Sequence, residues 1–218
     1  YDRLISVSSD PLVLAQAYLG KADALYNLAE YVQAAKVYKE GLNGIDKGSV
    51  PAELFDKLRY NLGLAYIKQG QLKAAIEEFD AVAKSSQDEE LKVGAFSQVG
   101  DAYHESGEFA KAEEAYANIL KNYPNSTYAD YAQYQLGLVY FQKGDYVAGC
   151  DIFSRFKNEL KDSPLASQAL YMLGTSLLNL NKPDEALIVF KDISKYSQDA
   201  ELLQKTEYEI ADCYYKLG

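Results

Sequence analysis

The chain is poor in the residues that mark metal sites, disulfide scaffolds and cofactor pockets. Among its 218 residues are one histidine, two cysteines and no tryptophan. A single histidine excludes a multi-histidine metal site, and Cys150 and Cys213 are too far apart for a zinc-ribbon pair. Two cysteines also make no disulfide scaffold. We therefore expect no metal and no cofactor in this protein.

Positive charge is also scarce. There are 22 Lys and Arg residues against 32 Asp and Glu residues, which gives a formal net charge of −10. This balance argues against non-specific nucleic-acid binding and against docking on anionic lipid through a basic patch. No segment approaches the roughly 18–20 apolar residues that span a bilayer, so we expect no direct membrane insertion within these residues.

What the sequence has is an internal repeat. From position 62 onward, an aliphatic residue followed by a small one recurs every 37 residues, and a further copy lies 41 residues upstream, at Ala22. The first five small residues are each followed by a large residue, a break, a second small residue and an aromatic, and the sixth is followed by a large residue and a break. The small residues are Ala22, Gly63, Gly100, Gly137, Gly174 and Ala211, and the aromatics are Tyr38, Phe79, Tyr116, Phe153 and Phe190.

Each repeat predicts a helical hairpin. Residues three and four apart lie on one helical face, and the Gly or Asn at each break tolerates the left-handed conformation that ends a helix. Pro183 suits the first turn of a following helix, because that position needs no amide donor. One hairpin buries little surface, whereas stacked hairpins bury a continuous core. The repeats therefore predict an all-α fold.

The pattern Leu-Gly-x-x-Tyr, then Ala-x-x-x-Phe, then Pro resembles the tetratricopeptide repeat, most closely at 134–146 and 99–116. The resemblance implies a right-handed superhelical solenoid of helix-turn-helix hairpins. The step is longer than the usual length of about 34 residues. Together with the Tyr-Pro-Asn-Ser turn at 123–126, it resembles the bacterial cell-envelope branch, which includes outer-membrane assembly lipoproteins and a periplasmic Tol-Pal-associated protein. The resemblance thus implies a periplasmic or outer-membrane-associated location.

We expect a single array over residues 1–218. Its repeats are predicted at about 15–50, 56–92, 93–129, 130–166 and 167–203, with a truncated repeat at 204–218. Residues 1–9 match the tail of a preceding helix, because Tyr1 and Leu4 are in phase with Tyr116 and Ile119. These ends predict that the chain is cut from a longer array.

The resemblance also implies that the first helix of each hairpin lines a concave groove. The groove positions form an aromatic and aliphatic stripe, with acids at Asp23, Asp101 and Asp212. Two interpretations are open: the rings pack between hairpins, or several are exposed and bind an apolar peptide or helix. The candidate partner-binding residues are Tyr60, Leu64, Ile67, Asp101, His104, Tyr134, Leu138, Phe141, Tyr171, Leu178 and Tyr208.

No catalytic constellation is visible. His104 lies beside Glu105, but no nucleophile with supporting partners occurs at a suitable spacing. Adjacent acids such as Glu77 and Glu78 point in different directions on a helix, so they form no converging pair. The glycines punctuate the repeats and form no phosphate loop. We therefore expect a non-enzymatic protein with no catalytic, cofactor-binding or metal-ligating residues.

The function that fits is a scaffold that binds a partner protein or peptide in a Tyr-rich groove, within a bacterial envelope assembly. Its acids would select partners that carry Lys or Arg. Two other classes stay open: a self-assembling module that forms a homo-oligomer, or the docking arm of a larger enzyme or secretion protein. A clamp for a C-terminal carboxylate is not expected, because Tyr60, Leu64, Ser97 and Asp101 stand where such repeats carry Lys and Asn.

Overall fold

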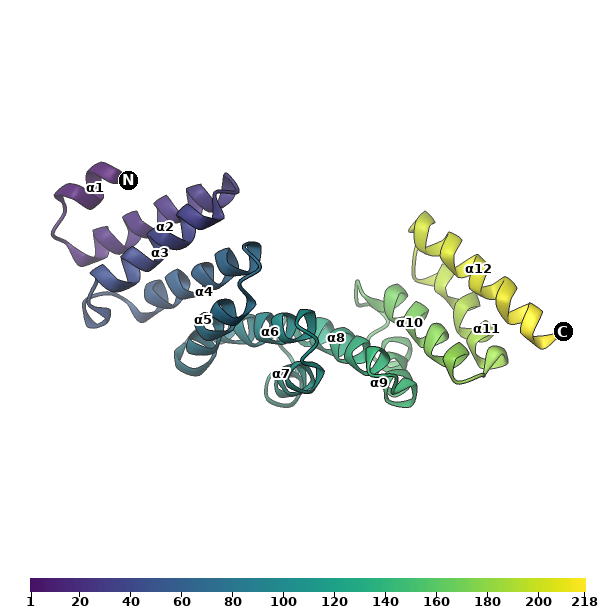
Figure 1. The fold of residues 1–218 in the computed structure, drawn as a ribbon. Helices are drawn as coiled ribbons and strands as arrows, with labels where there is room; N and C mark the ends of the chain where they lie inside the picture. Colours follow the sequence, from purple (N-terminus) through teal and green to yellow (C-terminus); the bar gives the residue numbers. More distant parts are fainter. The chain divides into compact units, whose positions relative to one another are not determined.

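The computed structural model describes residues 1–218, and all of its regular elements are helices (Figure 1). The all-α class predicted from the repeats is thus confirmed. The α-helices are α1 (Asp2–Val7), α2 (Pro11–Asn27), α3 (Tyr31–Gly44), α4 (Ala52–Lys68), α5 (Leu72–Ser85), α6 (Glu89–Glu105), α7 (Phe109–Asn122), α8 (Ala129–Gln142), α9 (Tyr146–Asn158), α10 (Ala166–Asn179), α11 (Pro183–Asp192) and α12 (Ala200–Leu217). Two short 3₁₀ helices follow α3 and α11, namely η1 (Lys47–Ser49) and η2 (Ile193–Lys195).

The chain divides into two compact units, unit 1 (Tyr1–Asn118) and unit 2 (Ile119–Gly218), and the boundary falls within α7. The single array over residues 1–218 therefore stays a prediction. Three predicted repeat starts, at 56, 93 and 204, lie four residues inside the helices that begin at Ala52, Glu89 and Ala200. None of the helices has the length and apolar character that crossing a membrane requires.

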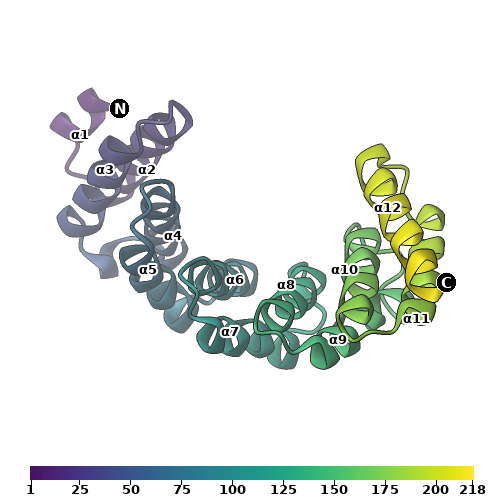
Figure 2. The same ribbon diagram turned by 45° about the vertical axis from the view of Figure 1, so that its right-hand side comes forward.

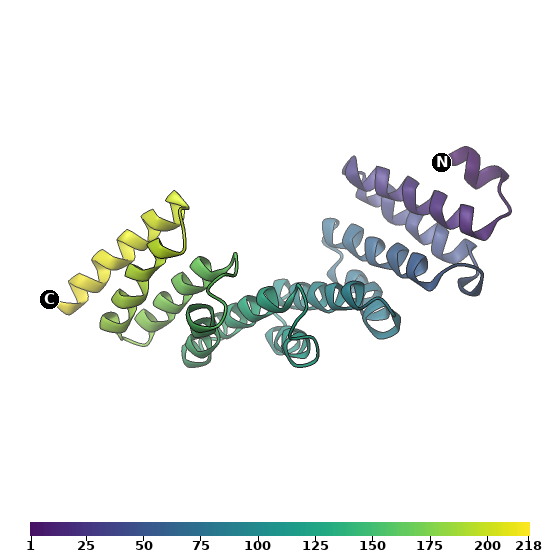
Figure 3. The ribbon, with the colours of Figure 1, turned by 180° about the vertical axis from the view of Figure 1, so that it is seen from behind.

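In unit 1, helices α2 to α6 pack in chain order, each against the next (Figure 3). One core cluster joins α2, α3 and α4 around the fully buried Tyr38 and Leu62. Another brings Phe79 of α5 against α6. The short α1 lies against α2, where the ring of Tyr1 covers Gly20 so closely that a Cβ there would be 2.6 Å from it.

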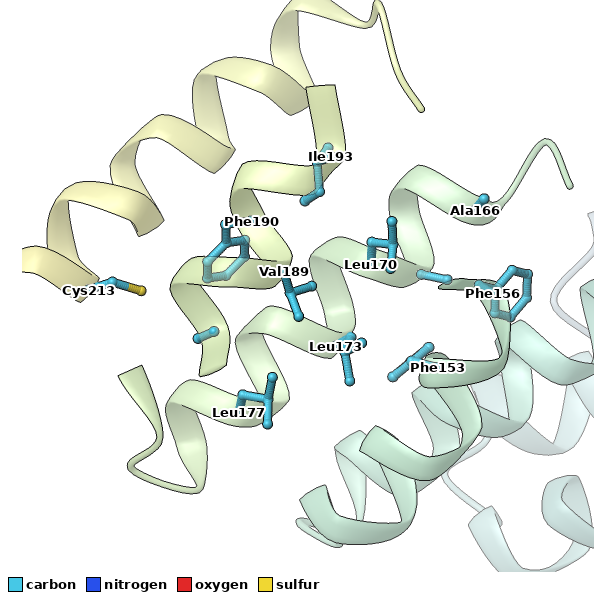
Figure 4. Close-up of a cluster of buried hydrophobic side chains, with 12 residues drawn as sticks. Phe153, Phe156, Ala166, Leu170, Leu173, Leu177, Val189, Phe190, Ile193 and Cys213 are labelled. Atoms are coloured by element: carbon cyan, nitrogen blue, oxygen red, sulfur yellow. The ribbon is translucent and has the colours of Figure 1, made fainter. Parts of the chain in front are cut away.

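In unit 2, helices α8 to α12 follow the same order of packing (Figure 2). The core cluster takes Phe153 and Phe156 from α9, Leu173 from α10, Phe190 from α11 and Cys213 from α12 (Figure 4). Four of these five side chains are at most 1% exposed, and Leu173 is 6% exposed. Each hairpin thus completes its core with residues of its neighbour, as stacked repeats require.

Inside four of the hairpins, the small residue of the first helix is a glycine that lies under the aromatic ring of the second. A Cβ added at Gly63, Gly137 or Gly174 would be 2.5–2.8 Å from the nearest ring atom of Phe79, Phe153 or Phe190. Gly100 has the same relation to Tyr116, at 2.6 Å. These distances are far below van der Waals contact, so only a glycine allows the two helices to approach this closely.

The turn between the two helices of a hairpin is the same in five cases. The break residues all have a positive φ, between 58° and 77°, and they are Ala29, Gly70, Gly107, Gly144 and Asn181. In each turn, the next residue donates its backbone N–H to a carbonyl near the end of the first helix. The donor–acceptor distance is 2.9 Å from Asp145 to Tyr140 and 3.0 Å from Lys182 to Leu177. This is the helix ending predicted for the breaks.

Candidate partner-binding surface

The candidate residues of unit 1 lie on two first helices. Tyr60, Leu64 and Ile67 are on α4, and Asp101 and His104 are on α6. All five side chains are half-buried. The three residues of α4 pack against the core cluster that contains Phe79. They are therefore covered by the core on one side and accessible on the other.

The candidate residues of unit 2 lie on α8, α10 and α12. Tyr134, Leu138 and Phe141 of α8 and Tyr171 and Leu178 of α10 are half-buried, like their counterparts in unit 1. Burial raises the pKa of the Tyr134 phenol above its ordinary value. The remaining candidate, Tyr208 of α12, is 71% exposed.

Three of the four rings that stand three residues before a small position have the same kind of partner, and the exception is the exposed Tyr208. Each of the three packs on the buried ring of its own hairpin, at centroid distances of 5.2 Å for Tyr60 on Phe79 and 6.0 Å for Tyr134 on Phe153. Tyr171 lies 5.8 Å from the ring of Phe190. Aromatic contacts of this kind stabilise a fold by about 0.5–1.5 kcal/mol beyond the area they bury. The inner edge of each ring thus belongs to the core, and the outer edge is accessible to solvent.

A ring four positions after the small residue packs against the first residue of the second helix, across the hairpin turn. Phe141 packs edge-on against Tyr146, the first residue of α9, at a centroid distance of 5.3 Å. His104 makes the same contact with Phe109, the first residue of α7, at 5.9 Å. His104, which the sequence named as a partner-binding residue, therefore also has a packing role near the end of its helix.

Two acids of the stripe are held by tyrosine hydroxyls. The Tyr38 hydroxyl donates to Asp23 Oδ1 at 2.5 Å, and the Tyr116 hydroxyl donates to Asp101 Oδ1 at 2.6 Å. Burial, followed by the hydrogen bond to Asp23, raises the pKa of Tyr38 far above its ordinary value. The third acid, Asp212, pairs instead with Lys216 at 2.5 Å.

Sequence reasoning missed this pairing, although a signal for it exists. A hairpin with an aspartate directly after its small residue has tyrosine as its buried ring, fifteen positions later. The hairpins with phenylalanine carry Leu64, Leu138 or Thr175 at the aspartate position. The repeat alignment therefore predicts which stripe positions form a hydrogen bond inside the hairpin and which present apolar or hydroxyl groups.

The surface offers little support for chemistry. No group of three or more His, Cys, Asp or Glu side chains is placed to hold a metal ion. Both cysteines are free, and burial raises the pKa of the Cys150 thiol to about 11. That thiol is therefore protonated at neutral pH and is a poor nucleophile. The arrangement suits binding through rings, aliphatic side chains and a few fixed polar groups.

Two protein families match parts of the chain. Residues 56–89 match the tetratricopeptide repeat, and residues 105–193 match the family described as anaphase-promoting complex, cyclosome, subunit 3. Neither description names a catalytic activity. No curated protein sequence matches the chain.

Several solved structures are similar to this one. A tetratricopeptide repeat protein from Parabacteroides merdae ATCC 43184 is 21% identical, with a TM-score of 0.72 over 94% of this chain and 73% of that one. The MamA protein is 20% identical, with a TM-score of 0.68 over 84% of this chain and 91% of that one. YrrB, described as a TPR protein with an unusual peptide-binding site, is 16% identical, with a TM-score of 0.63 over 88% and 90%. The chain therefore has the fold of the tetratricopeptide-repeat solenoids, and its residues 56–89 carry the sequence of that repeat.

Proposed function

We propose that the chain is a non-enzymatic scaffold that binds a partner protein or peptide on the first-helix surface of its hairpins. Each unit carries its own surface of this kind, made by the candidate residues of α4 and α6 in unit 1 and by those of α8 and α10 in unit 2. The observation that carries the proposal is the half-burial of these rings and aliphatic side chains. Each is fixed from below by the core and has an edge left for contact. YrrB, which shares the fold, is itself described as having a peptide-binding site.

The binding mechanism follows from the fixed rings. A partner buries its apolar side chains against the outer edges of Tyr134 and Tyr171, and little conformational entropy is lost because these rings are already ordered. The Tyr171 hydroxyl donates to Glu209 Oε1 at 3.2 Å, which adds a further restraint between α10 and α12. Such anchored aromatic residues supply most of the binding free energy in many interfaces.

The test uses a peptide selected on the intact chain from a random phage-displayed library. Its dissociation constant is measured by fluorescence anisotropy with the wild type, Tyr134→Ala and Tyr140→Ala. Both tyrosines are half-buried on α8, but Tyr140 lies outside the proposed surface. We expect Tyr134→Ala to weaken binding by about 1–3 kcal/mol and Tyr140→Ala to leave it within twofold.

The melting temperature of each variant is recorded alongside. If both variants lose binding in proportion to their loss of stability, the rings serve only the core and the proposal fails. If Tyr134→Ala binds as tightly as the wild type, the partner contacts another face, which also contradicts it.

Self-association is a second candidate, favoured by the exposed rings of α12. Tyr208 is 71% exposed, Tyr214 is 52% exposed and Tyr215 is 87% exposed. Tyr208 and Tyr215 are seven residues apart and therefore lie on one face of α12, and exposed rings on one face are typical of an interaction site. Sedimentation velocity at two concentrations tenfold apart distinguishes a homo-oligomer from a monomer that binds other proteins.

We also propose that the scaffold works in a bacterial cell envelope, in the periplasm or at the outer membrane. The support is the 37-residue step and the Tyr-Pro-Asn-Ser turn, in which the Ser126 N–H donates to the Tyr123 carbonyl at 3.1 Å. Fractionation of cells that express the tagged full-length protein tests the location. Recovery in the cytosolic fraction contradicts it.

A further inference from the structure

A pocket of about 250 Å³ opens between the first helices of two neighbouring hairpins in unit 1. It lies on the first-helix side, at the stripe position directly after the small residue of α2. Asp23, Tyr26 and Asn27 of α2, Tyr38 of α3, and Asn61 and Leu64 of α4 line it. Leu64 is one of the predicted partner-binding residues, and Asp23 is one of the stripe acids that were expected to select partners with Lys or Arg. The other four lining residues had no predicted role in partner binding.

The Asp23 carboxylate at this pocket is held firmly through one oxygen. Oδ1 accepts hydrogen bonds from the Tyr38 hydroxyl at 2.5 Å and from Asn61 Nδ2 at 2.9 Å. These donors come from two different helices, and Asn61 is 38 residues away in the sequence. The donors fix the orientation of the carboxylate, so that it needs no rearrangement when a ligand binds.

The second carboxylate oxygen, Oδ2, accepts no hydrogen bond from the chain, and Asp23 forms no ion pair with a lysine or arginine. The side chain is half-buried. An acid with one satisfied oxygen and no cationic partner, at a partly desolvated site, attracts a positively charged group more strongly than a solvated surface acid does.

We propose that this pocket binds the side chain of a lysine presented by the partner, an inference that rests on the proposed function. The ammonium group donates to Asp23 Oδ2, while the methylene chain lies along Leu64 and the ring of Tyr26. That ring is itself fixed by an edge-on contact with Tyr31, at a centroid distance of 5.2 Å. The pocket therefore supplies both a charge and apolar walls.

Lysine fits better than arginine because of the number of free acceptors. A guanidinium group binds a carboxylate best through two parallel hydrogen bonds, one to each oxygen. Oδ1 is already engaged by two donors, so a single oxygen remains, which matches the compact ammonium group of lysine. The corresponding positions of α4, α8 and α10 carry Leu64, Leu138 and Thr175, so this charge does not recur in those hairpins.

The test titrates the intact chain with three small probes that differ in one side chain. They are the Nα-acetyl methylamides of lysine, arginine and norleucine, of which norleucine has an apolar side chain of similar length and no charge. The side-chain amide signals of Asn61 and Asn27 are followed in ¹H–¹⁵N correlation spectra. We expect saturable shifts with the lysine probe, weaker affinity for the arginine probe and no saturable shift with the norleucine probe.

Three variants locate the effect. Asp23→Asn keeps an acceptor for Tyr38 and Asn61 but removes the charge, and we expect it to weaken lysine-probe binding by about tenfold or more. Glu77→Gln, on an exposed position of α5, makes the same change in net charge and should leave binding unchanged. Asn27→Lys, at the exposed end of α2, places an ammonium group beside the pocket and should abolish probe binding without touching the hydrogen bonds of Asp23.

The outcomes separate this pocket from the wider proposal. Equal affinity for the norleucine probe, tighter binding of the arginine probe, or lysine binding that survives both Asp23→Asn and Asn27→Lys would overturn the inference. None of these results bears on Tyr134, whose role is read from the selected peptide. Conversely, a selected peptide that ignores Tyr134 leaves the lysine-probe titration fully informative about Asp23.

Discussion

Two kinds of hairpin occur along this chain, and they differ in the side chains that lie beside one buried ring. In the tyrosine kind, α2–α3 and α6–α7, the ring is Tyr38 or Tyr116 and its hydroxyl donates to Asp23 or Asp101. In the phenylalanine kind, α4–α5, α8–α9 and α10–α11, the ring has no hydroxyl and the acid is replaced by leucine or threonine. The backbone turn is the same in both kinds.

The difference shows that one surface position is set by the core beneath it. A buried hydroxyl without an acceptor costs stability, so a tyrosine ring demands a polar neighbour on the first helix. A phenylalanine ring needs no such neighbour, and the position then carries leucine or threonine. The distribution of charged and apolar side chains on the first-helix surface is therefore partly a consequence of which ring each hairpin buries.

The largest effect should come from converting one kind into the other. Phe153→Tyr places a hydroxyl beside Leu138, which cannot accept its hydrogen bond, and we expect the free energy of unfolding to fall by about 1–3 kcal/mol. Adding Leu138→Asp supplies the acceptor. We expect the pair to show a favourable coupling free energy of about 1.5–3 kcal/mol.

Urea denaturation of the wild type, both single variants and the double variant gives this coupling. Additive effects would mean that ring and surface position are independent, and the comparison between the two kinds would lose its physical basis.

The second prediction concerns the glycine under the ring, which all three hairpins of the phenylalanine kind have and which the tyrosine hairpin α6–α7 shares. Gly137→Ala puts a Cβ 2.5 Å from the fully buried Phe153, so we expect a loss of about 1–2 kcal/mol even after the better helix propensity of alanine. Gly149→Ala is the matched control, because the nearest neighbour of its Cβ is 3.6 Å away. That change should raise stability by up to about 1 kcal/mol. If both variants change the free energy of unfolding in the same direction, the close approach of ring and glycine does not explain the need for glycine at position 137.

The third prediction concerns the part that the two kinds share. Ala29 ends α2 with a φ of 60°, whereas Gly144 ends α8 with a φ of 77°. Alanine is strained in this region and glycine is not. Ala29→Gly should raise the free energy of unfolding by about 0.5–1 kcal/mol, and Gly144→Ala should lower it by a similar amount. Differential scanning calorimetry measures both, and a neutral Ala29→Gly would show that the turn bears no strain.

The smallest predicted effect concerns Asp192, whose carboxylate is bound by two lysines, whereas that of Asp23 is bound by a hydroxyl and an amide. Asp192 contacts Lys195 Nζ at 2.6 Å and Lys157 Nζ at 3.0 Å, and these hydrogen bonds lower the pKa of its carboxyl below the ordinary 3.8. Its stabilisation is present above pH 3.8 and is lost as the pH falls through the lowered pKa.

Because Asp192 and its two lysines are partly exposed, we expect Asp192→Asn to lower the free energy of unfolding by only about 0.5 kcal/mol at pH 7. Melting curves from pH 7 to pH 2 should show the difference from wild type vanish at the acid end. A difference that persists at pH 2 would point to lost packing in place of lost charge.

The sequence predicts the hairpins well because their decisive contacts are local. The ring and the glycine it covers, such as Phe153 and Gly137, are only sixteen residues apart and belong to one motif. The left-handed breaks at Gly144 and Asn181 are also readable, since few residues adopt that conformation. Spacing and residue type were sufficient for this part of the fold.

The surface was less predictable because exposure depends on neighbours outside the motif. Tyr171 and Tyr208 occupy the same repeat position, yet the first is half-buried and the second is 71% exposed. Likewise, the bond from Asn61 to Asp23 depends on how two hairpins stack, which no single repeat specifies. The groove role of the eleven candidate residues stays a prediction.

The ring-and-glycine contact has a consequence for how such a chain tolerates changes in length. Gly63 and Gly100 are one step apart, and each is covered by a ring of its own hairpin. Excision or duplication of one whole step would keep every covered glycine matched with its ring. A deletion of any other length inside the helices would place a larger side chain under a ring, where only a glycine fits. We therefore expect natural length variants of this protein to differ by whole multiples of 37 residues.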